Sequence, residues 1–431
     1  MSEPEHAIGA RGVMSLKGHR SFTAYLSGEA SSLLGTSAHG VALPTLAVLE
    51  LHAGPDQIAA LALFAQLPTL LLALPAGAVV DRHGKKRLLV GTDLVAAVVV
   101  ATIPAAAAAG QLSVTLLYGV ALTLGASNVI HQAAAIAIVP QLVAADDLAA
   151  ANSRVGAAFS AADTLGTYAG TAIVALLGAA RAFLLDAASY LVSAWCASRI
   201  RPIPLPLRNV AKRRRMTGEI VEGLSYVART PLVRPLVLSL ALTGVGSGMI
   251  QTFWAYRMLT TLHAGPVGLG VVMGASGIGG LAGAINAPRI VRRWGPGRVL
   301  VCAFVICPSM SVPLLLASPG IDWLAVLAVA GAVQMASAAC AGTTQRSLRQ
   351  QICPPELQGR AQQTSTWLVS GSRPFASAAA GALASWGSVS AALYAGTLVL
   401  FVPVAVLWYS PVRRLTTMPR APEPAPSPTA C

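Results

Sequence analysis

Apolar residues in this chain come in runs of about twenty or more, without the stripe of period 3.6 that marks a surface helix. Runs of this length are typical of helices that cross a membrane. We therefore predict an all-α membrane protein with twelve transmembrane helices. The predicted spans are 22–50, 57–80, 88–109, 113–139, 153–178, 182–200, 234–260, 266–287, 299–317, 322–345, 362–386 and 389–409.

The predicted spans form two sets of six. The segment AGAVVDRHGKKRLLV (76–90) follows the second span, and AGAINAPRIVRRWGPGRVLV (282–301) follows the eighth. Each joins a helix end rich in small residues to a basic turn and a new apolar span, so the halves are weakly alike, as in many secondary transporters. We predict five regions: an N-terminal cytoplasmic segment, 1–21; a six-helix bundle, 22–200; a basic cytoplasmic linker, 201–233; a second six-helix bundle, 234–409; and a disordered cytoplasmic tail, 410–431.

Composition agrees with a membrane protein. Hydrophobic residues make up 55% of the chain and charged residues 11%, whereas soluble domains carry about 25% charged residues. The net charge of +14 needs no nucleic-acid partner, because 27 of the 30 lysines and arginines fall in the loops of one side if both termini are cytoplasmic. We expect a multi-pass protein of the cytoplasmic membrane of a bacterium.

Motifs for chemistry within the chain are missing. The sequence has no phosphate-binding loop of the Gly-x-x-x-x-Gly-Lys-Ser/Thr type and no Cys/His cluster for a metal or a nucleophile. Its six cysteines do not suggest a disulfide framework. We therefore expect no enzyme, no cofactor and no metal, and a process driven by an ion gradient or by the substrate's own gradient.

A loop motif gives the chain a family resemblance. GAVVDRHGKKR (77–87) resembles the signature of the major facilitator superfamily between its second and third spans. Further segments are similar to the drug-exporter branch that includes macrolide efflux pumps and enterobactin exporters: LSGEASSLLGTSAHGVALPTLAVLEL (26–51), GTDL (91–94), PQLVAADDLAAAN (140–152), LLDAASYLVSA (184–194), EIVEGLSYVARTPLVRPL (219–236) and PPELQGRAQ (354–362). The resemblance implies efflux of a small amphipathic molecule by proton antiport with alternating access.

Three positions depart from that exporter pattern. The Gly-Pro-x-x-Gly-Gly element of the fifth span is replaced by GTYAGT (166–171), and the arginine near the inner end of the fourth span is absent from Ala133–Ala135. The first span carries Glu29 where a glutamine is usual, which adds an ionisable group.

The loop motif is predicted to act as a gate. Asp81 can interact with the positive N-terminal end of a helix in the other half, and the resemblance implies that this latch closes the inner side. Gly77 is expected to permit close helix packing and Gly84 a tight turn. The alternative is a basic loop required only by topology. The predicted gating residues are Gly77, Asp81, Arg82, Gly84, Lys85 and Lys86.

Ionisable side chains inside membrane spans are costly and mark functional sites. Our candidates for proton coupling are Glu29, Asp163, His39 and His131. The alternatives are an inner-mouth position in water for Glu29, and structural hydrogen bonds for the others. We interpret Asp93 and Asp186 as structural, because the resemblance places their spans at the periphery.

Polar residues that the resemblance places near the central cavity are candidates for binding substrate. They are Gln132, Gln251, Gln334 and Arg373. Arg373 can bind an anionic substrate, pair with Asp163 or Glu29, or bond to backbone carbonyls near Pro374.

The expected partners are a small-molecule substrate, protons and the lipid bilayer, and the expected state is a monomer. Two alternatives to an exporter remain: an importer or facilitator of a small metabolite on the same fold, and a membrane receptor, regulator or membrane-embedded enzyme.

Overall fold

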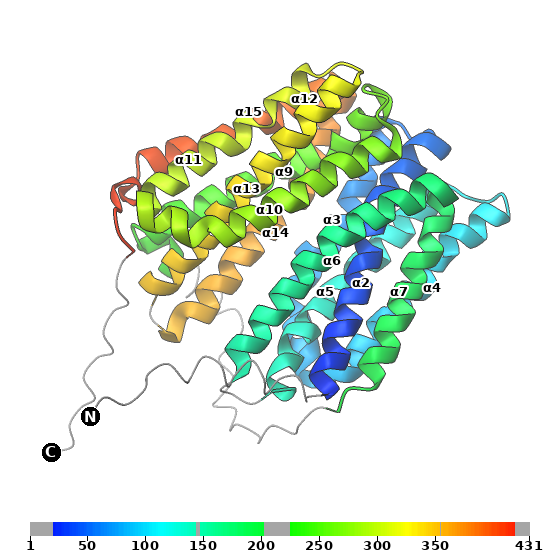
Figure 1. Cartoon of the computed structure of the whole chain (residues 1–431), viewed down its shortest axis with the longest axis horizontal. Helices are drawn as coiled ribbons and strands as arrows, with labels where there is room; N and C mark the ends of the chain where they lie inside the picture. Colours follow the sequence, from blue (N-terminus) through cyan, green and yellow to red (C-terminus); the bar gives the residue numbers. More distant parts are fainter. Residues whose placement is uncertain (1–19, 144–146, 202–224, 354, 419–431) are drawn as a thin grey trace, which may run out of the picture.

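The computed structural model describes residues 20–143, 147–201, 225–353 and 355–418, and the regular elements in these ranges are all helices (Figure 1). Within those helices, the side chains of Asp81 and Asp163 lie outside the described set. The first half contains α2 (Arg20–Thr45) with its π-helical continuation η2 (Leu46–Glu50), α3 (Pro55–Arg82), α4 (Lys85–Ala108), α5 (Val114–Ile138) with the 3-10 turn η3 (Val139–Gln141), α6 (Leu148–Leu177) and α7 (Ala179–Ser198). The second contains α9 (Val233–Thr260), α10 (Gly265–Trp294), α11 (Pro296–Ser309), α12 (Val312–Leu316), α13 (Ile321–Ile352), α14 (Pro355–Trp386), α15 (Val389–Trp408) and the 3-10 turn η5 (Pro411–Arg414).

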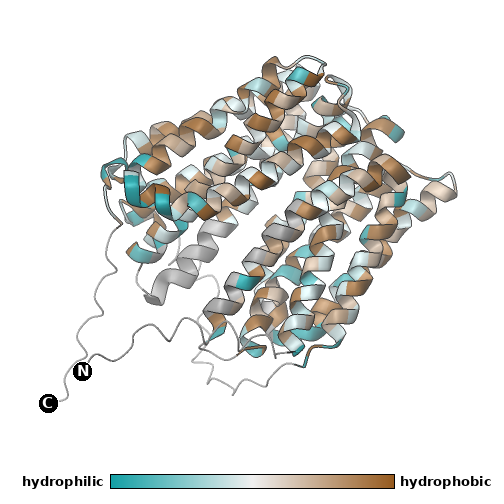
Figure 2. Ribbon diagram, in the orientation of Figure 1, coloured by the Kyte–Doolittle hydropathy of each residue, from teal (hydrophilic) through white to brown (hydrophobic). Residues whose placement is uncertain are grey.

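The twelve predicted spans each coincide with a long helix or a helix pair. Nine helices within the described ranges are long and apolar enough to cross a membrane. Their outward faces carry large apolar side chains, such as Ile136 and Val98, which are 73% and 68% exposed. Figure 2 shows hydrophobic residues along the length of both bundles. An apolar surface of this kind is stable only against lipid, so the chain is a multi-pass membrane protein.

Two details differ from the prediction. The expected single span 299–317 is broken between α11 and α12, where Pro308 and Pro313 flank the break and proline supplies no backbone N–H. The start of the expected disordered tail, 410–418, is ordered: Gly297 donates its N–H to Leu415 O at 3.0 Å, and the turn η5 lies against the start of α11. Residues 419–431 and 202–224 of the tail and linker lie outside the described ranges.

Two glycines join helices without a loop. Gly178 lies between α6 and α7 with φ of 83°, and Gly295 lies between α10 and α11 with φ of 80°. Side chains other than glycine rarely adopt these angles. Each glycine therefore reverses the chain within one residue between two consecutive helices.

The helices form two bundles. In the first, α2 packs against α6 and α7, α3 against α5, and α4 against α5 and α7. In the second, α9 packs against α14 and α15, and α10 and α11 pack against α13. The main contacts between bundles are α3 with α14 and α6 with α10.

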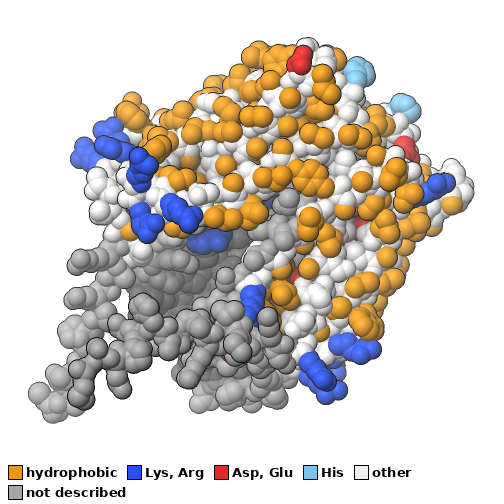
Figure 3. All heavy atoms as spheres, in the orientation of Figure 1, with side chains coloured by type: hydrophobic (Ala, Val, Ile, Leu, Met, Phe, Trp, Pro, Cys, Tyr) orange, Lys and Arg blue, Asp and Glu red, His pale blue; other side chains and the backbone are white. Residues whose placement is uncertain are grey.

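The two ends of the molecule differ in charge. The end that carries Arg20, Arg82, Arg199, Arg292 and Arg413 is called the basic end, and the other, where α2 is followed by α3, is called the opposite end. Figure 3 shows most lysine and arginine of the visible face along its left and lower parts, and histidine with aspartate or glutamate along its top and upper right, where one further basic side chain lies.

The bundles meet at the opposite end and diverge toward the basic end (Figure 1). One core cluster crosses both bundles and includes Val41, Phe183, Phe253 and Leu269. Toward the basic end, each bundle has its own core, with Phe22, Leu89 and Ile138 in the first and Leu236, Leu300 and Leu407 in the second. Among the described residues, packing between the two bundles is therefore concentrated at the opposite end.

Candidate functional site

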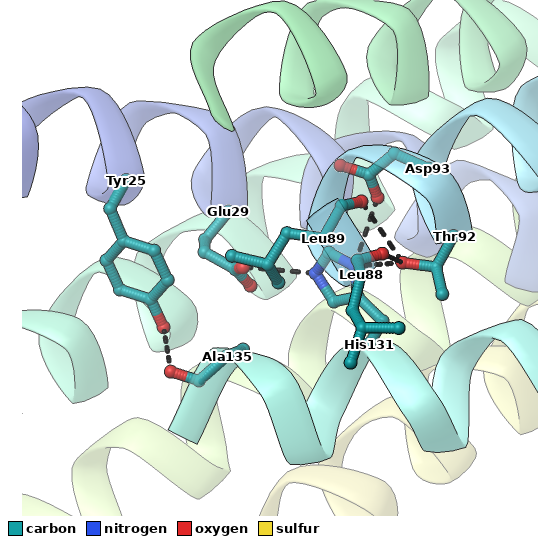
Figure 4. A network of polar contacts seen from close by, with 8 residues as sticks. All are labelled: Tyr25, Glu29, Leu88, Leu89, Thr92, Asp93, His131 and Ala135. Atoms are coloured by element: carbon teal, nitrogen blue, oxygen red, sulfur yellow. Dashed lines mark hydrogen bonds and ion pairs between the residues drawn. The ribbon is translucent and has the colours of Figure 1, made fainter. Parts of the chain in front are cut away.

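A histidine held between two carboxylates is the central polar feature of the first bundle (Figure 4). His131 of α5 places Nε2 3.0 Å from Oε1 of Glu29 on α2, and Nδ1 3.2 Å from Oδ1 of Asp93 on α4. The side chains of Glu29 and Asp93 are 10% and 2% exposed, and that of His131 is 15% exposed. Three helices thus meet at one buried, charged cluster, which we call the His131 triad.

When ionised, Glu29 and Asp93 offer only acceptors to the two ring nitrogens of His131. Thr92 Oγ1 lies 3.1 Å from Nδ1, and its own hydroxyl donates to Leu88 O at 2.8 Å, so its oxygen faces the ring as an acceptor. A neutral imidazole has one N–H, whereas the imidazolium has two. The doubly protonated ring therefore satisfies Glu29 on one side and Asp93 with Thr92 on the other.

The triad lies well inside the bundle. Glu29 is nine residues from the start of α2 at Arg20 and Asp93 is eight from the start of α4 at Lys85. A rise of 1.5 Å per residue puts both about 12 to 14 Å from the basic end. Tyr25, one turn before Glu29, donates its hydroxyl to Ala135 O at 3.2 Å and ties α2 to α5 beside the triad. Glu29 is therefore not the water-exposed mouth residue of the alternative interpretation.

A second imidazole–carboxylate pair joins α2 to α7. His39 Nδ1 lies 2.9 Å from Oδ2 of Asp186, whose side chain is fully buried. The His39 ring packs edge-on against Phe183, with ring centroids 5.0 Å apart. This pair, the His39–Asp186 pair, is ten residues along α2 from Glu29, or about 15 Å by helix rise.

The predicted proton-coupling residues therefore separate into two places. Glu29 and His131 come together, His39 lies elsewhere, and the Asp163 side chain is outside the described set. Asp93 and Asp186, which the sequence predicts to be structural, each lie beside a histidine that is a proton-coupling candidate. The available signal was the costly placement of an acid within an apolar span.

The substrate candidates do not share one environment. Gln132 and Gln251 are exposed, and so is Arg373. Gln334 instead donates Nε2 to Cys307 O at 2.9 Å and to Ser311 Oγ at 2.7 Å, so it is bonded at the break between α11 and α12. Arg373 forms no ion pair with Glu29, whose carboxylate instead lies against His131.

A buried arginine was not among the candidates. Arg257, in the last turn of α9, donates from Nε to Leu314 O at 2.9 Å and from Nη2 to Leu315 O at 3.0 Å. Its Nη1 donates to Ser390 Oγ of α15 at 3.1 Å. Because α12 ends at Leu316, Arg257 satisfies carbonyls that the helix end leaves free.

The predicted gating loop joins α3 to α4 at the basic end. Arg82 and Gly84 are exposed, and Lys85 and Lys86 are half-buried. A Cβ at Gly77 would meet no described atom within 4 Å, so the expected close helix packing is absent in this conformation. Gly84 has φ of −63°, which any residue adopts, so the turn does not require glycine there.

No group of three or more His, Cys, Asp or Glu among the described residues is arranged to hold a metal ion.

Comparison with known proteins gives the family. Residues 19–429 match the family described as transmembrane secretion effectors of the major facilitator superfamily. The multidrug efflux pump Tap of Mycolicibacterium fortuitum is 28% identical over 376 residues, covering 85% of this chain and 89% of Tap.

Solved structures show the same fold. A bacterial homologue of the iron transporter ferroportin in an inward-facing state has a TM-score of 0.71 at 16% identity, covering 90% of this chain and 98% of that one. The nucleoside transporter NupG has a TM-score of 0.70 at 12% identity, covering 89% and 97%. These relatives are membrane transporters rather than enzymes. The chain belongs to the transmembrane secretion effector family of the major facilitator superfamily, and it is a multi-pass transporter of small molecules.

Proposed function

We propose that the protein exports a small amphipathic molecule from a bacterial cell across the cytoplasmic membrane, in exchange for protons. The family description and the name of the relative at 28% identity support the direction of transport. The observation that carries proton exchange is His131, with an acceptor at each ring nitrogen inside an apolar bundle.

The triad can bind and release a proton without leaving the bundle. With two carboxylates and an imidazolium it carries one net negative charge, and one more proton makes it neutral. In a low-dielectric interior, the free energy of this net charge depends on the groups packed around it. Gain or loss of the proton therefore favours one packing of α2, α4 and α5 over another. Because α2 also packs against α6, and α6 against α10 of the second bundle, a shift of α2 reaches the contact between bundles.

The proposed orientation follows from charge. The positive-inside rule puts the basic end, and hence both termini, in the cytoplasm. Because the bundles pack together at the opposite end and diverge toward the basic end, we propose that this is the inward-facing conformation, ready to load substrate from the cell. In the outward-facing state the basic ends close, and we propose that Asp81 with Arg82, Lys85 and Lys86 latches the first bundle to the second. The protein is proposed to work as a monomer, since each chain holds two complete bundles.

A direct test uses the purified protein in proteoliposomes that contain a pH-sensitive dye. A panel of lipophilic dyes and antibiotics, including ethidium, is added with and without a pH gradient. We expect a pH gradient to drive at least one compound across the proteoliposome membrane. Transport of that compound should be accompanied by proton movement in the opposite direction. The variant Glu29→Gln is expected to lose this coupling, whereas Glu50→Gln, on the exposed end of η2, is expected to keep it.

Two results would overturn the proposal. Coupling that survives in Glu29→Gln and in Asp93→Asn would remove the triad from the mechanism. Protons and substrate that move in the same direction would indicate an importer instead.

A further inference from the structure

A groove lies between α2 and α7 at the basic end of the first bundle. Its volume is about 410 Å³, within the range of roughly 300 to 1,000 Å³ that is usual for small-ligand sites. One stripe of each helix lines it: Arg20, Thr23, Ala24 and Ser27 of α2, and Trp195, Cys196 and Arg199 of α7. Figure 1 shows α7 on the side of the first bundle that faces away from the second. Since Arg20, Ser27 and Trp195 are exposed, the groove opens on the outer surface of the bundle.

Two arginines flank this groove without an acid to neutralise them. The only acid in α2 is Glu29 and the only acid in α7 is Asp186, and each of these faces a histidine. Within the described ranges, no carboxylate forms an ion pair with Arg20 or Arg199. Guanidinium groups bind phosphate through two parallel N–H bonds. The charge at this end of the groove therefore fits a phosphate group.

Both arginines belong to an ordered part of the bundle. The guanidinium of Arg199 lies over the Trp195 ring, 4.7 Å from its centroid, in a cation–π contact. The hydroxyl of Ser21 donates to Arg201 O at 3.3 Å and accepts from Arg201 N at 3.1 Å. These bonds fix the start of α2 beside the end of α7. The position of the two arginines relative to the groove is thus set by the fold.

The surface beyond the arginines is apolar. On α7, Trp195, Leu191 and Val192 are 58%, 51% and 46% exposed, and on α2 Leu34 is 39% exposed. Leu191 is eight residues from Arg199, or about 12 Å along the helix. Apolar side chains exposed at this depth pack against acyl chains, and tryptophan is typical of the boundary between headgroups and hydrocarbon. A free phosphate ion fits only the basic end of this surface, whereas a phospholipid fits both parts.

We propose that this groove, the α2–α7 groove, binds an anionic phospholipid of the leaflet at the basic end. The phosphate binds Arg20 and Arg199, and the acyl chains lie against Trp195 and Leu191. A headgroup that binds both arginines holds the start of α2 against the end of α7. The site depends on neither the direction of transport nor proton exchange, because it uses only the surface that the first bundle presents to the membrane.

The experiment counts lipids bound to the full-length protein. Phosphatidylglycerol is added to the purified chain in detergent, and retained lipid is measured by native mass spectrometry. Phosphatidylcholine with the same acyl chains and inorganic phosphate are the comparison ligands. We expect phosphatidylglycerol to be retained in preference to phosphatidylcholine and not to be displaced by inorganic phosphate. Arg20→Gln and Arg199→Gln should each weaken its binding about fivefold, the worth of one arginine beside an anionic membrane surface.

Two further variants separate the groove from general surface charge. Arg413 of the second bundle also lies at the basic end and covers a tryptophan, with 5.2 Å to the centroid of the Trp408 ring. Arg413→Gln removes the same charge from that end and should leave retention of phosphatidylglycerol unchanged. Ser27→Leu keeps every charge and puts a larger side chain into the groove, so it should weaken retention.

Three results would overturn the proposal. Equal retention of phosphatidylglycerol and phosphatidylcholine would remove the preference for an anionic lipid. Equal losses in Arg199→Gln and Arg413→Gln would indicate surface charge alone, and displacement by inorganic phosphate would indicate an anion site without a lipid. Should Arg199→Gln not fold because it loses the contact with Trp195, Arg20→Gln and Ser27→Leu decide the same question.

Discussion

Thr171 of α6 lies directly against the backbone of Gly270 in α10, so that a Cβ at Gly270 would overlap the threonine side chain. Thr171 is six residues before the end of α6, and Gly270 is five after the start of α10. The contact therefore belongs to the opposite end. One turn away, Tyr168 occupies the space in front of Gly274 in the same manner. Glycine at these positions allows the bundles to close there.

A methyl group at Gly270 is expected to open the opposite end. Gly270→Ala overpacks a contact that exists only while this end is closed, at a cost of about 1 to 3 kcal/mol. That cost shifts the population between the two states by roughly 5- to 150-fold. Spin labels on cysteines at His52 and Asp322, which are exposed at this end on different bundles, should report a longer distance in a background without reactive native cysteines.

The matched control for this change lies on the same helix. A Cβ at Gly280 would meet only Met335 Cβ, at 3.9 Å, which is an ordinary contact. Gly280→Ala should leave the label distance unchanged. An unchanged distance in Gly270→Ala as well would show that this contact does not hold the closed end.

Arg257 is expected to support the fold of the second bundle. Arg257→Ala removes three hydrogen bonds and leaves Leu314 O and Leu315 O without their donor. Losing hydrogen bonds from a charged group at a buried site should cost on the order of 3 kcal/mol. Thermal unfolding of the purified protein in detergent should therefore begin at a lower temperature.

Arg181 provides the comparison for Arg257. It lies near the same end of the molecule and is exposed, so Arg181→Ala should change the unfolding temperature little. Arg257→Lys should recover only part of the loss, because an ammonium group lacks the planar fork that reaches two carbonyls. Equal unfolding temperatures for Arg257→Ala and Arg181→Ala would contradict this role.

The helices could be predicted from sequence because a membrane span leaves a long apolar run. The ends of α3, α9 and α15 fall within two residues of their predicted bounds. The α11–α12 break was missed because Pro308 and Pro313 lie in an apolar run that reads as one span. Proline is tolerated in membrane helices where neighbours satisfy the freed groups, and here Gln334 does so from another helix.

The site was harder to predict because its residues come from different helices. Glu29 and His131 are 102 residues apart, and no local spacing shows that they meet. Asp93 was assigned to the periphery by its span, but its side chain points inward to His131 (Figure 4). The rotation of α4 about its own axis determines which way Asp93 points. That rotation depends on packing between helices, which the apolar run in the sequence does not show.

Replacing Gln334 or Gln251 by leucine, which has no amide group, should affect different properties of the protein. Gln334→Leu leaves Cys307 O and Ser311 Oγ without a donor, so it should lower the unfolding temperature and leave substrate affinity nearly unchanged. If Gln251 binds substrate, as the sequence predicts, Gln251→Leu should weaken binding about three- to tenfold, the worth of one hydrogen bond. Binding by fluorescence titration and thermal unfolding, on both variants, separates the two roles; the reverse pattern would contradict the assignment.

His131 is expected to be needed for stability because it compensates two buried carboxylates. His131→Leu leaves Glu29 and Asp93 facing each other without a cation, and breaking a buried ionic cluster in this way typically costs about 3 to 5 kcal/mol. Chemical unfolding of His131→Leu should therefore show a marked loss. That loss should be smaller at ~pH 5 than at ~pH 8, since protonation removes the charge that burial disfavours.

The combined variant Glu29→Gln, Asp93→Asn, His131→Leu shows whether charge or shape causes the loss. If uncompensated charge is the cause, neutral amides in place of the carboxylates should restore most of the stability, because nothing charged remains buried. If shape is the cause, the leucine leaves the same packing defect in both variants, and both should be equally unstable at every pH. A loss of stability in His131→Leu that is independent of pH, and that the combined variant does not recover, would mean that the ring acts through packing. That result would contradict a proton-binding role for the triad.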